Sequence, residues 1–143
     1  MGHQDKGHFA AKHEGHKMNK TIADRIRATA VNDAVTCAAA HRISKELNLP
    51  PSEIGIQIDL LEFKITECQL GLFGHGNGKK KINPEIEISS DLDDKLKKAA
   101  VDGRISCLSC WDIADQLKMK RIDLGSACEK RSIRIKHCQL GSF

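Results

Sequence analysis

The chain has 143 residues, a formal net charge of +4, and few aromatic side chains: four Phe, one Trp and no Tyr. This length suits one compact domain. The scarcity of aromatic rings argues against a platform on which the bases of single-stranded nucleic acid stack. No apolar run approaches the roughly 20 residues of a membrane span, and the first residues lack the apolar stretch of a signal peptide. We therefore expect no membrane association and a cytoplasmic location, where the six cysteines are reduced.

The most informative feature is an internal repeat, because residues 21–73 reappear without a gap at residues 91–143. Thirteen of the 53 aligned pairs are identical, where ordinary composition gives roughly three or four. Both copies close on Cys-Gln-Leu-Gly, at residues 68–71 and 138–141. Such a long period, with several elements in each copy, is typical of a duplicated small domain. One copy alone has marginal stability, so we expect the two to share a core or to pair tightly.

The repeat divides the chain into four segments. Residues 1–20 are polar and rich in Gly and His, and we expect a mobile tail. Residues 21–73 and 91–143 are the two repeats. Residues 74–90 begin with the turn sequence Gly-His-Gly-Asn-Gly, which predicts a β-hairpin whose return strand Pro84 confines to an edge.

Each repeat shows the apolar spacing of three helices followed by a short strand. The first helix is expected to begin at an N-cap, Thr21, with Asp24 three residues on, and Asp91 and Asp94 repeat this arrangement in the second repeat. Pro51 suits the first position of the third helix. The strands run through Ile65 and Ile135, and their pattern slips at the following cysteine, as at a bulge or a strand end. In the first repeat the apolar stripes of the three helices are Ile22, Ile26 and Ala30; Ala40, Ile43 and Leu47; and Ile54, Ile58 and Leu61. The aligned residues of the second repeat are Leu92, Leu96 and Ala100; Cys110, Ile113 and Leu117; and Leu124, Cys128 and Arg131. Arg131 replaces Leu61, so the second repeat must pack that end of its third helix less deeply or let the arginine reach solvent.

The second and third helices carry the pattern of a helix-turn-helix motif. Residues 43–54 read ISKELNLPPSEI, with small Ser44 early in the first helix and a turn at Asn48. Residues 113–124 read IADQLKMKRIDL, with Ala114 and Lys118 in the same places. With a helix in front and a hairpin behind, each repeat resembles the winged helix-turn-helix family, although the usual turn glycine is absent. The tandem Cys-Gln-Leu-Gly ends also resemble an uncharacterised bacterial family. The resemblance implies a mainly α fold with short β strands: two tandem three-helix, helix-turn-helix or winged-helix-like repeats with pseudo-two-fold symmetry.

In the winged helix-turn-helix family the third helix enters the major groove of DNA. In the first repeat this helix is acidic, since it carries Glu53, Asp59 and Glu62, and phosphates would repel it. The second repeat is basic there, and the family layout would point Arg121, Ser126 and Lys130 at the groove. We therefore predict a transcription-regulator-like protein that contacts duplex DNA through Lys118, Lys120, Arg121, Ser126, Lys130, Arg131 and Arg134. The alternative is a structural or protein-interaction module on the same scaffold, with the acidic first repeat as the surface for a protein partner.

The cysteines and histidines offer a third alternative, a metal-binding or metal-responsive protein. Cys107-Leu-Ser-Cys110, with Cys128 and Cys138, would supply four thiolates for zinc. The repeat argues against such a site, because Cys110 and Cys128 replace the core residues Ala40 and Ile58. We expect no metal site and no cofactor. Loose metal capture would fall to His3, His8, His13, His16 and His75, whose spacing matches no rigid site.

Catalytic residues are also not expected. Neither a Ser-His-Asp group nor a pair of carboxylates recurs in both repeats. Nothing in the chain therefore indicates an active site, and we do not expect an enzyme.

Overall fold

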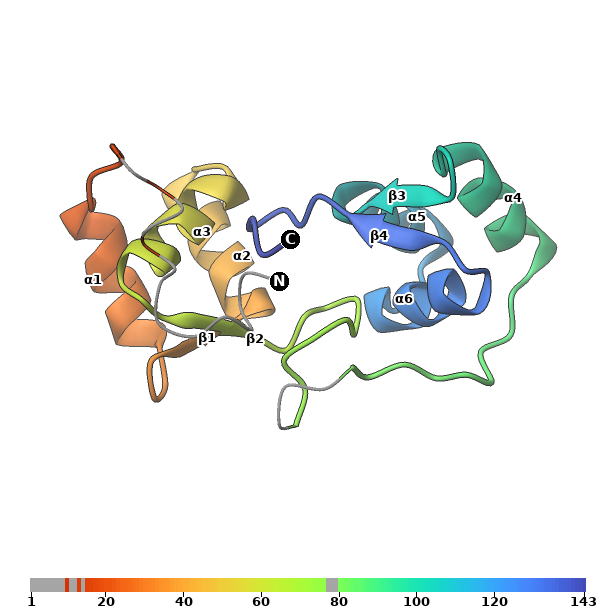
Figure 1. The fold of residues 1–143 in the computed structure, drawn as a ribbon, viewed down its shortest axis with the longest axis horizontal. Coiled ribbons are helices and arrows are strands. Elements are labelled where there is room, and N and C mark those ends of the chain that lie inside the picture. The colour runs from red at the N-terminus through yellow and green to blue at the C-terminus, as the bar shows by residue number, and fades with distance from the viewer. Residues whose placement is uncertain (1–9, 11–12, 14, 77–79) are drawn as a thin grey trace. The chain divides into compact units, whose positions relative to one another are not determined.

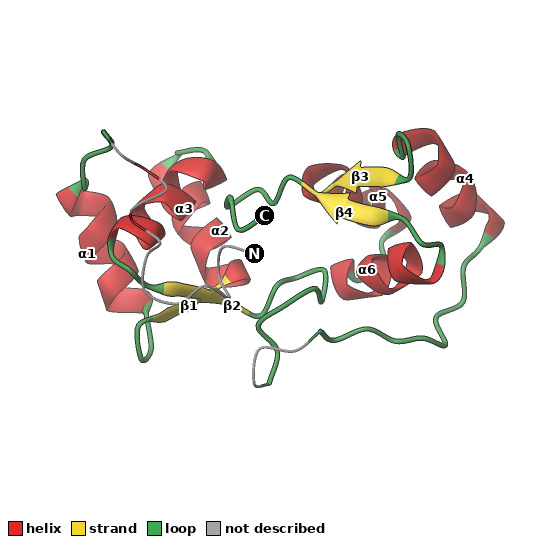
Figure 2. Ribbon diagram, viewed as in Figure 1, coloured by secondary structure: helices red, strands yellow, loops and turns green. Residues whose placement is uncertain are grey.

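The computed structural model describes residues 10, 13, 15–76 and 80–143. Its described residues form six helices and four three-residue strands, so the predicted fold class, mainly α with short β, is confirmed (Figures 1 and 2). The helices and strands follow the same order in both repeats. They are α1 (Lys20–Thr29), β1 (Ala34–Thr36), α2 (Cys37–Leu47), α3 (Pro51–Leu60) and β2 (Lys64–Thr66), then α4 (Ser90–Ala99), β3 (Arg104–Ser106), α5 (Cys107–Leu117), α6 (Arg121–Lys130) and β4 (Arg134–Lys136).

The chain folds into two compact units that do not coincide with the two sequence repeats. Unit 1 is the chain up to Cys68 together with Gln139–Phe143, and unit 2 is Gln69–Cys138. The five residues after each Cys-Gln-Leu-Gly cysteine thus belong to the unit built from the other repeat. We call residues 69–73, in unit 2, strap 1 and residues 139–143, in unit 1, strap 2.

The strands pair within each unit, and the pairing is parallel. Val35 lies opposite Ile65 in unit 1, and Ile105 lies opposite Ile135 in unit 2. A parallel pair needs a long crossover, which the second and third helices supply. The predicted β-hairpin after the first repeat is wrong, because the described residues of 74–90 form no strand. Instead the amide of Lys81 donates a 2.7 Å hydrogen bond to the carbonyl of Gly71.

A tight turn precedes each of the strands β1 and β3, two strands that were not recognised in the sequence. Asn32 and Asp33 have φ of 52° and 59°, and Asp102 and Gly103 have φ of 54° and 73°. Positive φ at both central residues defines the type I′ turn that Asn and Gly favour. The strands that follow have one fully buried side chain each, too few to produce a visible alternation.

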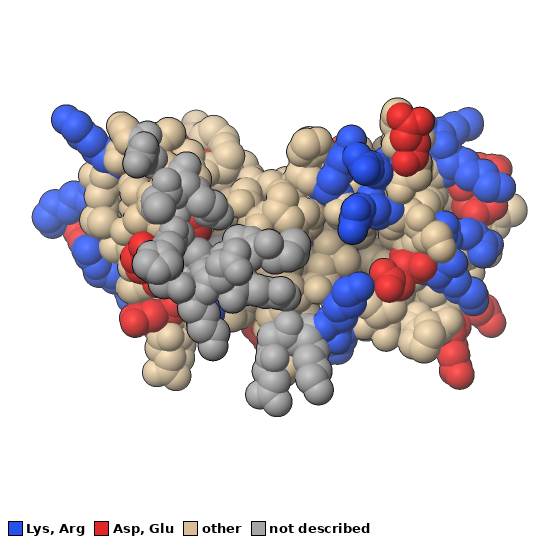
Figure 3. Space-filling model, in the orientation of Figure 1, with Lys and Arg blue, Asp and Glu red and all other residues tan. Residues whose placement is uncertain are grey.

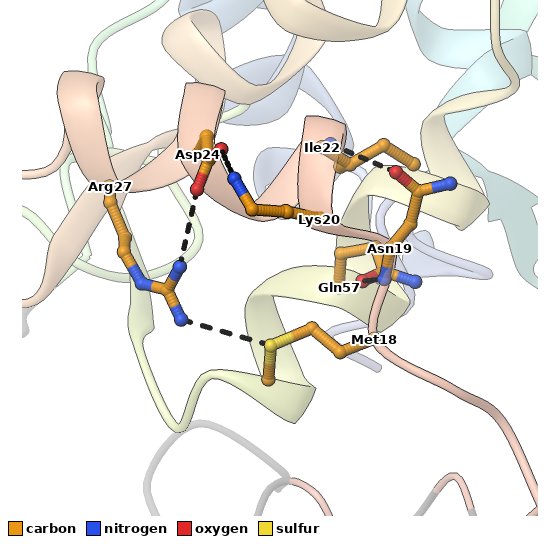
Figure 4. A network of polar contacts seen from close by, with 7 residues as sticks. All are labelled: Met18, Asn19, Lys20, Ile22, Asp24, Arg27 and Gln57. Atoms are coloured by element: carbon orange, nitrogen blue, oxygen red, sulfur yellow. Dashed lines mark hydrogen bonds and ion pairs between the residues drawn. The ribbon is translucent and has the colours of Figure 1, made fainter.

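Side chains from just outside α1, α2, α4 and α5 cap the N-termini of these four helices. Asn19 caps α1 and Ser89 caps α4, so the predicted N-cap Thr21 is wrong and α4 begins before Asp91. The Asn19 side chain accepts from the backbone amide of Ile22, and the backbone amide of Asn19 donates a 2.8 Å hydrogen bond to Oε1 of buried Gln57 (Figure 4). The cap therefore also ties the start of α1 to α3. Pro51 begins α3, as predicted.

The turn of each helix-turn-helix contains a residue in the left-handed region. Asn48 and Lys118 both have φ of 54°, although neither is glycine. The next amide in each case, from Leu49 or Met119, bonds back to the carbonyl of Ser44 or Ala114. This arrangement satisfies the last carbonyls of α2 and α5. Asparagine tolerates the conformation, whereas lysine is strained in it.

We predict that Lys118→Gly stabilises unit 2, because it removes the steric cost of a left-handed lysine. Glycine also raises the conformational entropy of the unfolded chain, which offsets part of the gain. The net increase in the free energy of unfolding should be up to about 1 kcal/mol. Urea denaturation followed by circular dichroism measures it. Asn48→Gly is the matched control, with a smaller expected gain. A loss of stability in Lys118→Gly would contradict the strain.

Candidate nucleic-acid interface

The third helix of each unit is enclosed through its middle, and this determines which surfaces are free for a partner. In α6, the five residues Leu124–Cys128 are all buried. In α3, Ile54, Gly55, Gln57, Ile58 and Asp59 are buried. A helix that lies on a surface buries one stripe only. Here the side that a groove-reading helix would present to DNA is covered as well.

Strap 1 covers α6 at Gly125. A Cβ atom at this position would lie well under 3.0 Å from the carbonyl oxygen of Leu70, closer than real Cβ atoms approach other atoms. The Leu70 side chain is fully buried. Nη1 of Arg121 donates 2.9 Å to Oε1 of Gln69, which fixes the strap at the start of the helix. Glycine at 125 is therefore required for the strap to reach the helix backbone.

The residues that lead into α4 run along α6 beyond the strap. The Ser126 hydroxyl accepts from the amide of Asn83 at 2.9 Å. Lys130 donates 2.9 Å to the carbonyl of Ile86, and Lys80 lies 3.5 Å from Glu129. These contacts cover the C-terminal half of the helix.

Unit 1 encloses α3 in the same way. A Cβ atom at Gly55 would meet the carbonyl oxygen of Leu140, from strap 2, well under 3.0 Å away. The C-terminal end is marked beside the helices of unit 1 in Figure 1. In unit 1 the residues before α1 cover the third helix, as residues 80–86 do in unit 2. His13 Nε2 lies 2.7 Å from Asp59, and the Gln57 side chain donates a hydrogen bond to the carbonyl of Lys17. The described part of the predicted mobile tail is therefore bound to α3; residues 1–9, 11–12 and 14 lie outside the described residues.

The seven residues predicted to contact DNA fall into three groups. Lys118, Lys120 and Arg134 are exposed, and none of their side chains has a hydrogen bond or an ion pair among the described residues. The second group, Arg121, Lys130 and Arg131, is bound within unit 2. Ser126 is 2% exposed and donates 3.2 Å to the carbonyl of Ile122, so the expectation that its side chain faces a groove does not fit its position.

Arg121 is held by three groups of unit 2. Its guanidinium lies 3.7 Å from the centroid of the Trp111 ring, in a cation–π contact. It also bonds to Gln69 and lies 3.6 Å from Asp115. The side chain is used to hold strap 1 against the helix-turn-helix, and DNA would have to displace these contacts to bind it.

Arg131 reaches solvent, as one of the two sequence alternatives proposed, and forms an ion pair with Asp93. Its Nε lies 2.9 Å from the carboxylate, and Lys97 lies 2.9 Å from the other oxygen. The hydrogen bonds from Lys97 and Arg131 lower the pKa of Asp93 from its usual value.

The strand pair of unit 2 supplies a basic residue that sequence reasoning missed. Arg104 on β3 lies directly opposite Arg134 on β4, and both are exposed. The corresponding pair in unit 1 is Ala34 and Lys64. Figure 3 shows a group of Lys and Arg side chains over the strands of unit 2, with other basic groups separated from it by acidic residues. The Asp-Gly turn before Arg104 was the sequence signal for a strand here.

Cys107, Cys110 and Cys128 form part of the core of unit 2. Cys110 and Cys128 are buried, and their Sγ atoms lie 4.0 Å apart. The contact with Cys128 and burial raise the pKa of the Cys110 thiol, which makes it a poor nucleophile. Within the described part of the chain, no three His, Cys, Asp or Glu side chains gather where they could hold a metal ion.

Comparisons with protein-family models, with curated proteins and with solved structures gave no match to this chain. None of the helices in the described residues is long and apolar enough to cross a membrane.

We predict that Gly125→Ala destabilises unit 2 by about 2–3 kcal/mol, because its methyl group would displace the backbone of strap 1. The single tryptophan, Trp111, lies in this unit, so urea unfolding followed by its fluorescence measures the loss. Gly55→Ala is the same substitution in unit 1 and should shift the Trp111 signal less. Equal shifts would contradict a local clash.

We also predict a change in the titration of Asp93. Because its pKa is lowered in the folded state, its ion pairs contribute stability at neutral pH, and this contribution is lost as the pH falls through the acid range. Lys97→Gln and Arg131→Gln should each raise the Asp93 pKa toward its ordinary value. NMR titration of the carboxyl carbon tests this, with Lys98→Gln as the control. An unchanged pKa in both variants would show that the pairs do not persist.

Proposed function

We propose that unit 2 binds duplex DNA through contacts to the phosphate backbone, made by Lys118 and Lys120 at the turn before α6 and by Arg134 on β4. The observation that carries the proposal is the exposure of these three side chains, none of which has a described partner. Each lysine or arginine that neutralises a phosphate releases counterions, so such binding weakens steeply with salt.

The covered middle of α6 limits what this interface can read. In a helix-turn-helix the N-terminal residues of the third helix contact base edges. This end of α6 lies next to Lys118 and Lys120, whose side chains are exposed and have no described partner, whereas Lys130 at the other end is bonded to the carbonyl of Ile86. Gly125 and Ser126, in between, lie beneath strap 1 and the residues leading into α4. We therefore expect DNA binding with little sequence preference, since phosphate contacts give position without base readout.

The difference between the two units supports assigning the contacts to unit 2. Asn48 and Pro50 stand where unit 2 has Lys118 and Lys120. On the strands, Ala34 stands where unit 2 has Arg104. Lys64 alone keeps a positive charge, at the position of Arg134.

A protein-interaction module is the second candidate, and one observation favours it. Val31 and Val101 are 70% and 65% exposed at the same place in both repeats, at the start of the type I′ turns. Leu108 is also exposed, on the first turn of α5. Single exposed apolar residues are common, but recurrence at a matched position suits a surface that contacts another protein.

Charge reversal at matched positions tests the DNA proposal. Arg134→Glu should weaken binding to a duplex of about two helical turns by roughly tenfold at low salt and should reduce the slope of log affinity against log salt by about one. Fluorescence anisotropy at low salt and at about 0.15 M salt measures both quantities.

The control is Lys64→Glu, the same change of charge on the equivalent strand of unit 1. It should leave the affinity nearly unchanged. Equal losses in the two variants would indicate attraction to net charge alone, and no binding at low salt would overturn the proposal in favour of the interaction module.

A further inference from the structure

We propose that the surface of α3 around Gly55 is a binding site for an extended Gln-Leu-Gly segment, and that a second copy of this chain can supply that segment from its own strap 2. The inference goes beyond the proposed DNA contacts and does not depend on them. It identifies a self-association device in which the C-terminal strap passes from one chain to another.

The first step is that the site is built for backbone approach. Gly55 has no side chain, and the carbonyl of Leu140 lies against the helix where a Cβ atom would otherwise be. The Leu140 side chain is 2% exposed, and Ser142 is 4% exposed. Glycine at the centre of a helix costs stability relative to alanine. The close approach of the strap explains why glycine occurs here in spite of this cost.

The second step is that the two units repeat the same recognition. Gly125 receives the carbonyl of Leu70 as Gly55 receives that of Leu140. The glycine after each leucine, Gly71 or Gly141, has a left-handed backbone with φ of 80° or 83°. Both straps therefore present a buried leucine followed by a positive-φ glycine, so the interaction depends on a local motif and not on one particular stretch of chain.

The third step is that each unit already takes its strap from outside its own repeat. Strap 2 is the end of the second repeat in the sequence, yet it belongs to unit 1. Such an exchanged element can come from another copy at little cost, because the contacts are the same in either case. Within one chain the tether gives an effective strap concentration on the order of mM, so exchange between chains is weak until the internal strap is disabled.

We choose strap 2 for exchange because one contact that holds strap 1 has no counterpart there. In unit 2, Arg121 bonds to Gln69 and stacks on Trp111, which anchors strap 1 at the start of α6. In unit 1 the residue aligned with Arg121 is Pro51, which has neither a charged group nor an amide hydrogen to donate. Strap 2 therefore has no counterpart of this arginine contact, although Gln139 does interact with other groups.

Two full-length variants with complementary defects test the proposal. Leu140→Asp leaves the α3 site intact and disables strap 2. Gly55→Val blocks the α3 site and leaves strap 2 free. When they are mixed at a concentration on the order of 0.1 mM, below the effective concentration of the tethered strap, strap 2 of the Gly55→Val chain should occupy α3 of the Leu140→Asp chain.

Hydrogen exchange with mass spectrometry gives the readout. Peptides that contain residue 55 differ in mass between the two variants, so α3 of the Leu140→Asp chain is followed separately in the mixture. We expect its amide exchange to slow at least severalfold, and sedimentation velocity to show a dimer. α6 serves as the folded reference in both chains.

The matched control is the double variant Gly55→Val/Leu140→Asp, which has the same blocked site and no working strap. It should not protect α3 of the Leu140→Asp chain. If the strap-bearing and strapless partners protect α3 equally, or neither does, the proposal is overturned. A synthetic peptide of residues 136–143 provides a second measurement that needs no second folded chain. Absence of α3 protection by this peptide at mM concentration would likewise count against the site.

Discussion

The contact between a leucine carbonyl and a helical glycine organises both units. Leu70 against Gly125 and Leu140 against Gly55 bring an extended strap onto the backbone of the third helix. This approach is possible only where the helix has no Cβ. Identical motifs at the ends of the repeats are therefore explained by packing: the leucine fills a core position, and the following glycine adopts the positive φ that the strap requires. The repeated cysteines before the straps lie at the point where the chain passes from one unit to the other.

Because the third helix is enclosed, the helix-turn-helix pattern does not by itself indicate a helix that is open to DNA. The α2–turn–α3 and α5–turn–α6 segments have the expected turn, including left-handed residues at Asn48 and Lys118. A strap nevertheless covers the middle of each third helix, together with the residues that precede α1 in unit 1 and α4 in unit 2. Charged residues near α6 are divided accordingly, because Arg121 and Lys130 hold covering segments, whereas Lys118 and Lys120 stay exposed. A local motif that is typical of DNA-binding proteins here serves first as a packing scaffold.

Much of the secondary structure was predictable from the sequence, because it depends on local patterns. Helical spacing located all three helices of each repeat, Pro51 marked the start of α3, and the replacement of Ala40 and Ile58 by cysteines identified Cys110 and Cys128 as core residues. The strands β1 and β3 were missed because three residues with one buried side chain give no periodic signal. Ser126 was misjudged because a small polar residue on a helix does not reveal whether solvent or a buried backbone amide is its partner.

By itself, the sequence determined that one small α-rich unit occurs twice and that the second copy carries the excess of basic residues, since both properties follow from comparing aligned positions. Only the tertiary structure decided which strap lies on which helix. Two copies of the same Gln-Leu-Gly segment fit two equivalent glycine sites, and no local preference distinguishes the segment of one repeat from that of the other. The path of the connecting chain and the packing around each helix make that choice, and with it they decide which basic side chains remain free for a partner.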